Sequence, residues 1–367
     1  MQVPFLNLDA QYQQIKDEIQ ATISEVIESK NFIQGPYAES FEKNFNEVHG
    51  CKFSVGCSNG TSAITVALRS LGVGPGDEVI TAANTFFATV EAIHEVGAKI
   101  VLVDCRPDTY CIDLVKMEEA IGKKTKCLIP VHLYGNLCEM DRVMEVANKY
   151  NLSVIEDSAQ AHLAKYKNAA VGTFGNIGTF SFYPGKNLGA YGDAGLIVTR
   201  DEKLQQNLKM QVNHGRTKKY EHDFLAGNFR MDGLQAAILN VKLKYLSEWT
   251  QKRIDLAKKY DAALKNKGFK VIEVQKDGVC VYHLYIVEVS NREEVMNTLK
   301  ATGISTGIHY PVPMHLQPAL AFLGHKLGDF PNAENSCDRI LSLPFCPYMV
   351  DMQLDYTVEK FLEVAKG

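Results

Sequence analysis

The 367-residue sequence has no CxxC pair, no long apolar run and no excess of charge of one sign. Its nine cysteines, an odd number without that pairing, argue against a zinc site and against a disulfide framework. Without about 18 consecutive apolar residues, neither a membrane span nor a signal peptide is predicted. The net charge of −4 and the scattered Lys and Arg argue against nucleic acid as a partner. We therefore expect a soluble, cytoplasmic protein that binds no metal, nucleic acid or membrane.

The chain also lacks internal repeats and low-complexity segments, and its organisation shows instead in alternating hydrophobic patterns. Helix-period segments such as 62–72, 88–97 and 139–150 separate several short apolar runs. The expected strands are 53–57, 78–82, 99–104, 126–133, 152–157, 177–183 and 194–199. This alternation predicts an α/β domain with a largely parallel sheet, in which ligands gather at the carboxyl ends of strands.

A second domain is expected because the chain exceeds the size at which one core usually stops growing. A long helical pattern over 234–266 leads out of the first domain, and strand-like 279–289 and helix-like 292–303 follow it. We place a large domain at 1–249 and a small C-terminal domain at 250–367.

Three segments at the expected strand ends contain residues with possible functional roles. Each segment, taken alone, also has a purely structural interpretation. SNGTSA (58–63) offers free backbone N–H groups to an anion, or forms an ordinary capped helix start. In IEDSAQAH (155–162), a buried acid needs a partner, unless Asp157 simply caps a helix. In SFYPGKNLGAYGDAG (181–195), the single lysine, Lys186, taken alone is most simply a solvated loop residue.

Taken together and in order, these segments resemble a known family. They occur with NTFFAT (84–89), PVHLYG (130–135), GNFRMDGLQAA (227–237) and GIHYPVPMHLQ (307–317). The sequence resembles the DegT/StrS-type sugar aminotransferases over essentially the whole chain. This resemblance implies the type I, aspartate aminotransferase-like fold of pyridoxal-phosphate (PLP) enzymes. In that fold a large domain contains a mainly parallel seven-stranded sheet, and a smaller C-terminal α/β domain follows.

The resemblance implies a role for each residue near the cofactor ring. Lys186 would be the catalytic residue and would hold PLP as a Schiff base, because burial and nearby cations lower a lysine pKa and free the amine. Asp157 would pair with the pyridine nitrogen, Gln160 would hydrogen-bond the 3-hydroxyl, and Phe86 would stack on the ring.

The resemblance also implies a phosphate site shared between two subunits. Gly60, Thr61 and Ser181 would surround the phosphate with backbone N–H groups and hydroxyls. Asn228 would reach it from the neighbouring subunit, which implies a homodimer with shared active sites.

Substrate-binding candidates come from two further segments and from Tyr183 beside the lysine loop, which could face the sugar or simply pack in the core. The prolines of 307–317 predict an extended loop that presents side chains to a ligand, although loop packing would also explain it. A basic, aromatic segment at 213–224 could meet a diphosphate or a base, or form a solvated face. The candidates are Tyr183, Arg216, Lys219, Tyr220, His309, Tyr310 and His315.

The lysine loop also indicates the reaction. Retention of Lys186 argues against the family's dehydratases, which carry histidine there, and PGKNLGAYGDAG resembles enzymes that aminate C3, with Ala194 in place of one glycine. We expect transamination from L-glutamate to a dTDP-3-keto-6-deoxyhexose, giving a dTDP-3-amino-3,6-dideoxyhexose. The alternatives are a UDP-linked 3-keto uronic acid as acceptor, or a non-catalytic regulatory protein of the same fold.

Overall fold

A seven-stranded sheet forms the centre of the structure, a computed structural model that describes residues 1–366. The strand order is β1-β9-β8-β5-β4-β2-β3. β9 is antiparallel to both its neighbours, and the other neighbouring pairs are parallel. Each strand coincides with an apolar run of the sequence, so the expected α/β sheet is confirmed. The strands are β1 (Phe53–Cys57), β2 (Glu78–Ala82), β3 (Lys99–Val103), β4 (Thr125–Ile129), β5 (Ser153–Asp157), β8 (Ile177–Ser181) and β9 (Gly195–Thr199).

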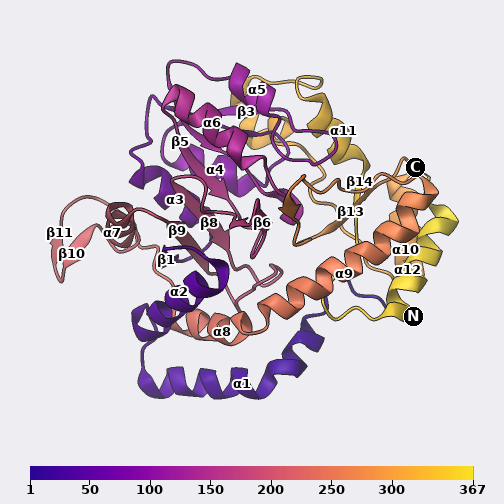
Figure 1. Cartoon of the computed structure of the whole chain (residues 1–367), viewed down its shortest axis with the longest axis horizontal. Helices are drawn as coiled ribbons and strands as arrows, with labels where there is room; N and C mark the ends of the chain where they lie inside the picture. The colour runs from indigo at the N-terminus through magenta and orange to yellow at the C-terminus, as the bar shows by residue number, and fades with distance from the viewer. Residues whose placement is uncertain (367) are drawn as a thin grey trace.

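Helices cover both faces of this sheet, because successive residues of a strand point to opposite sides. On β2, Val79 packs beneath one helical layer and Ile80 beneath the other. The first layer contains α3 (Gly60–Ser70), α4 (Phe87–Glu95) and α7 (Glu202–Gln211). The second contains α2 (Gly35–His49), α5 (Leu114–Glu119), α6 (Met140–Tyr150) and α8 (Gly233–Leu243). The long helix α1 (Leu8–Ser29) packs against α8 at the edge of the molecule (Figure 1).

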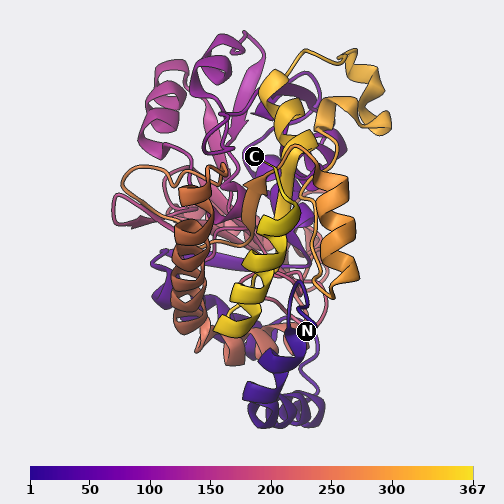
Figure 2. The same ribbon diagram turned by 90° about the vertical axis from the view of Figure 1, so that its right-hand side faces the viewer.

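A second core follows in the C-terminal part of the chain, where α9 packs against a two-stranded sheet and two further helices. In Figure 2 the C-terminal helix α12, in yellow, runs across this part of the molecule. Val3 joins this core and pairs with Ile304, so the chain start lies with its end. The domain boundary at 249/250 stays a prediction. The elements are α9 (Leu246–Leu264), β13 (Tyr285–Glu288), α10 (Arg292–Ala301), α11 (Pro331–Arg339), β14 (Ile340–Leu343) and α12 (Asp351–Val364).

Two expectations about this part were wrong. The helical pattern over 234–266 forms two helices, because α8 ends at Leu243 and α9 begins only at Leu246. The expected strand 279–289 is extended in a sheet only at β12 (Gly278–Val279) and at β13. The residues between them leave the sheet, and two of them, His283 and Leu284, face a cavity instead.

The remaining elements are short. A hairpin of β10 (Arg216–Lys218) and β11 (Glu221–His222) projects from the body of the molecule (Figure 1). β6 (Lys165–Tyr166) pairs with β12 and with β7 (Ala169–Ala170). Four 3-10 turns are η1 (Leu133–Gly135), η2 (Lys265–Lys267), η3 (Met314–Leu316) and η4 (Pro318–Leu323). Over residues 1–366, no helix combines the length and apolar character needed to cross a bilayer.

Candidate active site

A cavity of about 680 Å³ opens where the parallel strands end. Its floor comes from residues at or just after the ends of β1, β2, β5 and β8, and its other wall comes from the C-terminal core. The predicted residues that it brings together are Gly60, Thr61, Phe86, Asp157, Gln160, Ser181, Tyr183, Lys186, His309 and Tyr310. This set joins the catalytic, cofactor-binding and substrate-binding predictions in one place.

Lys186 lies in the loop between β8 and β9, and its side chain lines the cavity. Its backbone N–H donates to the carbonyl of Tyr183 at 2.8 Å, which closes a tight turn. Gly189 permits this turn, since a Cβ there would lie 2.4 Å from the carbonyl oxygen of Pro184. Burial lowers the pKa of Lys186 to about 8, although the charge of Asp157 partly opposes this effect. The ammonium form still predominates near physiological pH, but a much larger fraction of this amine is neutral than in a solvated lysine, as a nucleophile requires.

Asp157, the last residue of β5, presents a buried carboxylate to the same cavity. The backbone N–H of Ala159 donates to Oδ1 at 3.2 Å, and the hydroxyl of Thr89 donates to Oδ2 at 2.9 Å. Burial raises the pKa of Asp157, and these two donors and the charge of Lys186 oppose that rise. A buried carboxylate with so few donors is suited to binding a further N–H or cationic partner.

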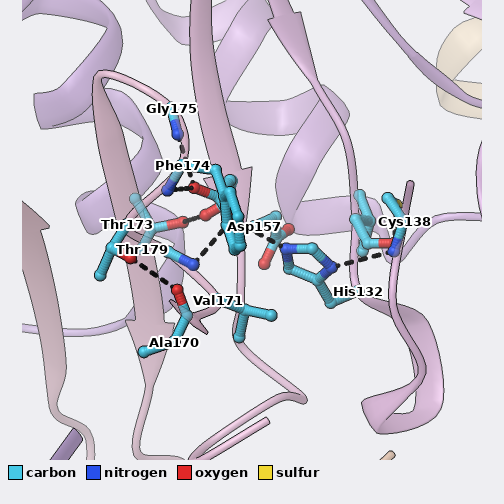
Figure 3. Close-up of polar contacts among 12 residues, drawn as sticks. His132, Cys138, Asp157, Ala170, Val171, Thr173, Phe174, Gly175 and Thr179 are labelled. Atoms are coloured by element: carbon cyan, nitrogen blue, oxygen red, sulfur yellow. Dashed lines mark hydrogen bonds and ion pairs between the residues drawn. The ribbon is translucent and has the colours of Figure 1, made fainter. Parts of the chain in front are cut away.

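The preceding residue, Glu156, holds the end of β5 in place from the other side. Backbone N–H groups of Gly172, Phe174 and Gly175 each donate to its carboxylate at 2.7 Å (Figure 3). The ring of His132 also lies at this carboxylate, with Nε2 3.1 Å from Oε2, while its Nδ1 accepts from the N–H of Cys138. This tautomer makes Nε2 the donor. Sequence reasoning missed this role of Glu156, which no local motif signals.

Gln160 is held in one orientation by two neighbours. Its Oε1 accepts a 2.6 Å hydrogen bond from the N–H of Tyr134, and its Nε2 donates to the hydroxyl of Tyr310 at 3.3 Å. The ring of Tyr310 lies 5.1 Å from that of Phe86, tilted by 35°. The amide and the two rings therefore form a contiguous surface beside Asp157.

The start of α3 forms an anion cradle next to Ser181. Asn59 caps this helix, accepting from the N–H of Ser62 at 2.8 Å, and its carbonyl accepts from the N–H of Ala63. The N–H groups of Gly60 and Thr61 keep no partner among residues 1–366, and the helix dipole favours negative charge there. A Cβ on Gly60 would lie 2.7 Å from Cβ of Ser181, so only glycine leaves this space open.

Five predicted residues lie outside the cavity of the single chain. His315 is buried elsewhere, with Nε2 2.8 Å from Oε1 of Glu334, and the structure does not bring it to the site. The other four lie on or near the projecting hairpin: Arg216, Lys219, Tyr220 and Asn228.

Sequence reasoning also missed residues of the cavity wall. Asp193 comes from the loop after Lys186, where the sequence pattern assigns it no role. Arg253 and His283 come from α9 and the segment before β13, and no motif marks either of them. Burial, and then the charge of Lys186, lower the pKa of His283 well below its usual range.

The residues present fit PLP. The cradle at α3 offers two free N–H groups to a phosphate, and Lys186 offers an amine to an aldehyde. Asp157 offers a buried carboxylate to a pyridinium nitrogen, and the volume accommodates a small cofactor with a substrate beside it.

Comparison with known proteins agrees with this geometry. A relative from Geobacillus stearothermophilus named pleiotropic regulatory protein is 44% identical over 99% of this chain and 98% of its own. The dTDP-3-amino-3,6-dideoxy-alpha-D-galactopyranose transaminase of Aneurinibacillus thermoaerophilus is 42% identical over 97% of this chain and 98% of its own. The crystal structure of DesV from S. venezuelae in complex with a ketimine intermediate superposes with a TM-score of 0.96. It is 39% identical and covers 99% of this chain and 98% of its own.

The family comparison covers nearly the whole chain. The model of the DegT/DnrJ/EryC1/StrS aminotransferase family matches residues 13–362. Solved neighbours include a putative sugar aminotransferase from Streptococcus pneumoniae in PMP and PLP forms, 27% identical, with TM-scores of 0.90 and 0.89. The chain therefore belongs to the DegT/DnrJ/EryC1/StrS aminotransferase family and is a PLP-dependent sugar-nucleotide aminotransferase.

Proposed function

We propose that this enzyme transfers the amino group of L-glutamate to the C3 keto group of a dTDP-3-keto-6-deoxyhexose, giving a dTDP-3-amino-3,6-dideoxyhexose. The observation that carries the proposal is the amine of Lys186, which shares one cavity with the carboxylate of Asp157 and the anion cradle at Gly60. The sugar class is supported by the lysine loop and by the activity for which the Aneurinibacillus relative is named.

Each residue of the floor has a proposed task that its contacts support. Gly60, Thr61 and Ser181 hold the cofactor phosphate at the start of α3. Asp157 keeps the pyridine nitrogen protonated, and Gln160, already fixed by Tyr134, donates to the ring hydroxyl. Bound PLP supplies an electron sink for the carbon that loses its proton.

Lys186 moves that proton. Its pKa of about 8 would let the amine accept a proton from Cα of the amino donor and, as an ammonium group, deliver it to the cofactor carbon on the other side of the transferred nitrogen. The same residue works in both half-reactions, first with glutamate and then in reverse with the keto sugar. The kinetics are therefore ping-pong.

The acceptor sugar binds at the mouth of the cavity. Tyr183 is 61% exposed beside Lys186 and is free to contact a bulky ligand. His309 and Tyr310 face it from the C-terminal core. Burial, and then the charge of Lys186, lower the pKa of His309 to about 4, so it meets the sugar as a neutral hydrogen-bonding group.

A second subunit completes this site in our proposal. Tyr220 is 82% exposed on the projecting hairpin, and Arg216 and Lys219 lie beside it without reaching the cavity of their own chain. A basic, aromatic arm of this kind suits the nucleotide diphosphate of a neighbouring site. Asn228, close to the base of the hairpin, would reach the cofactor phosphate of that site. His315 has no part in this arrangement, because Glu334 binds it.

A UDP-linked 3-keto uronic acid is the second candidate acceptor. One observation favours it: Arg253, a buried guanidinium, lines the cavity, and a uronate carboxylate would pair with it. A purely regulatory role would give no reason for Lys186 and Asp157 to face one cavity.

An absorption spectrum tests the proposal. The purified enzyme with PLP should absorb at about 415 nm, and L-glutamate should replace that band with one at about 330 nm. The Lys186→Ala variant should lack the absorption band that the wild type shows with PLP, and it should have no turnover. A wild-type spectrum that does not change on adding glutamate would contradict the donor half of the proposal. Product analysis with dTDP- and UDP-linked keto sugars then identifies the acceptor.

A further inference from the structure

Arg253 is a buried cation that its own chain leaves without a counter-ion. It lies on α9, and only 3% of its surface is exposed. One terminal nitrogen donates to the carbonyls of Tyr282 and His283, both at 3.3 Å. Its Nε is buried and has no partner, and no carboxylate of residues 1–366 forms an ion pair with it.

The guanidinium is charged at neutral pH. Burial lowers the pKa of Arg253 to about 10, and the thiol of Cys346 partly opposes that effect. An unpaired buried charge is costly unless a partner arrives, and a planar guanidinium matches a carboxylate with two parallel hydrogen bonds. The ring of Phe345 lies 5.5 Å from it and makes one side of this position apolar.

Its place in the cavity limits what that partner is. Arg253 lines the same cavity as Lys186, and His283 and His309 line it as well. Both histidines are uncharged because burial lowers each pKa, so Arg253 is the permanent cation of this wall. The phosphate of the cofactor already has donors at α3. In the proposed function the sugar diphosphate lies near exposed residues such as Tyr183. Arg253 is far more deeply buried than Tyr183, so the diphosphate is not its partner.

We propose that Arg253 is the carboxylate-binding residue of the active site. Its ligand is a carboxylate group of the reacting molecule itself, which lies deep in the cavity. Two molecules carry such a group: the amino donor, whose carboxylate adjoins the reacting carbon, and a uronate acceptor. This inference rests on the proposed function, because it assumes that both molecules react at Lys186.

The test compares Arg253→Gln and Arg253→Lys with the wild type, all loaded with PLP. The matched control is Arg292→Gln, because Arg292 likewise donates to two backbone carbonyls, of Cys337 and Ile340, but lies outside the cavity. The donor arm measures the glutamate concentration that half-saturates the spectral change. The acceptor arm measures binding of UDP-glucuronate, UDP-glucose and UDP by calorimetry.

We expect half-saturation by glutamate to rise by about 30-fold or more in Arg253→Gln, and less in Arg253→Lys, with an unchanged PLP spectrum. If the uronate is the ligand, the variant loses its preference for UDP-glucuronate over UDP-glucose instead. Guanidinium ion should partly restore an Arg253→Ala variant, which a purely structural role would not explain.

Unchanged glutamate saturation together with unchanged UDP-glucuronate preference would overturn the proposal. A fall in UDP affinity as large as that for UDP-glucuronate would do the same, because it would assign Arg253 to the diphosphate. Failure of the wild type to respond to glutamate at all would instead count against the proposed function.

Discussion

The hydroxyl of Thr89, in the first turn of α4, donates a 2.9 Å hydrogen bond to Oδ2 of Asp157. Oγ1 of Thr85 lies 2.8 Å from Oγ1 of Thr89, so the hydrogen bonds extend from Asp157 through Thr89 to Thr85. Thr89 therefore fixes the direction of the carboxylate on which the proposed pyridinium contact depends.

Removing that hydroxyl should weaken the cofactor site without changing its shape. A hydrogen bond to a charged group is worth about 1.5–3 kcal/mol, so Thr89→Val should lower kcat/KM by about 10-fold or more. The dissociation constant for PLP should rise with it. Thr85→Val, one hydroxyl further from Asp157, is the control and should have a smaller effect on both. Equal effects of the two variants would show that the pair acts only through packing.

The cradle at α3 predicts that Gly60 tolerates no side chain. Gly60→Ala places a Cβ 2.7 Å from Cβ of Ser181 and fills the space assigned to the phosphate. We expect PLP affinity to fall by about 10- to 100-fold, which corresponds to about 1.4–2.7 kcal/mol. Gly74→Ala is the control, since its Cβ would meet nothing closer than 3.8 Å. Normal PLP binding by Gly60→Ala in a fluorescence titration would show that the phosphate does not bind at this position.

The pKa of Lys186 predicts how the apoenzyme responds to pH. Only the neutral amine attacks an aldehyde, and burial lowers this pKa from about 10.5 to about 8. The rate of PLP capture should therefore rise with pH and level off above about pH 9. Asp157 raises the pKa of Lys186, so Asp157→Asn should move the midpoint below 8. Stopped-flow absorbance gives both midpoints, and a wild-type midpoint near 10 would mean that the amine is solvated.

The proposed shared site predicts complementation between inactive variants. Lys186→Ala removes the amine, and Asn228→Ala removes the contact expected from the neighbouring subunit. If each site draws on both chains, mixed dimers contain one site with both residues intact and should recover up to about half of the wild-type activity per dimer. Subunit exchange is verified by mass spectrometry. Exchange without recovery would place Asn228 in its own chain's site.

Much of the floor was predictable because the sheet itself arranges it. Asp157 and Ser181 end two neighbouring parallel strands, and each strand end stands out in the sequence as an apolar run followed by polar residues. Strand order was not predictable in the same way. The insertion of antiparallel β9 between β1 and β8 depends on long-range packing that no local pattern encodes.

The opposite wall was the part that sequence reasoning could not find. Arg253 lies within an amphipathic helical pattern that gives no reason to single it out, and its significance comes only from its burial beside the cavity. His315 shows the opposite case. The proline-rich loop suggests a ligand contact, but in the single chain this side chain lies outside the cavity, with Nε2 2.8 Å from Oε1 of Glu334.

The two origins of the cavity walls have a practical consequence for protein engineering. The floor is tied into the sheet through β5, where Glu156 alone binds three backbone N–H groups, and it leaves little freedom for variation. The facing wall is supplied by Arg253 of α9 and by connecting segments around 283 and 309. Libraries aimed at new sugars should therefore randomise those connecting segments and leave Arg253 and the strand ends untouched, so that the choice of acceptor can evolve while the amino-transfer chemistry is inherited.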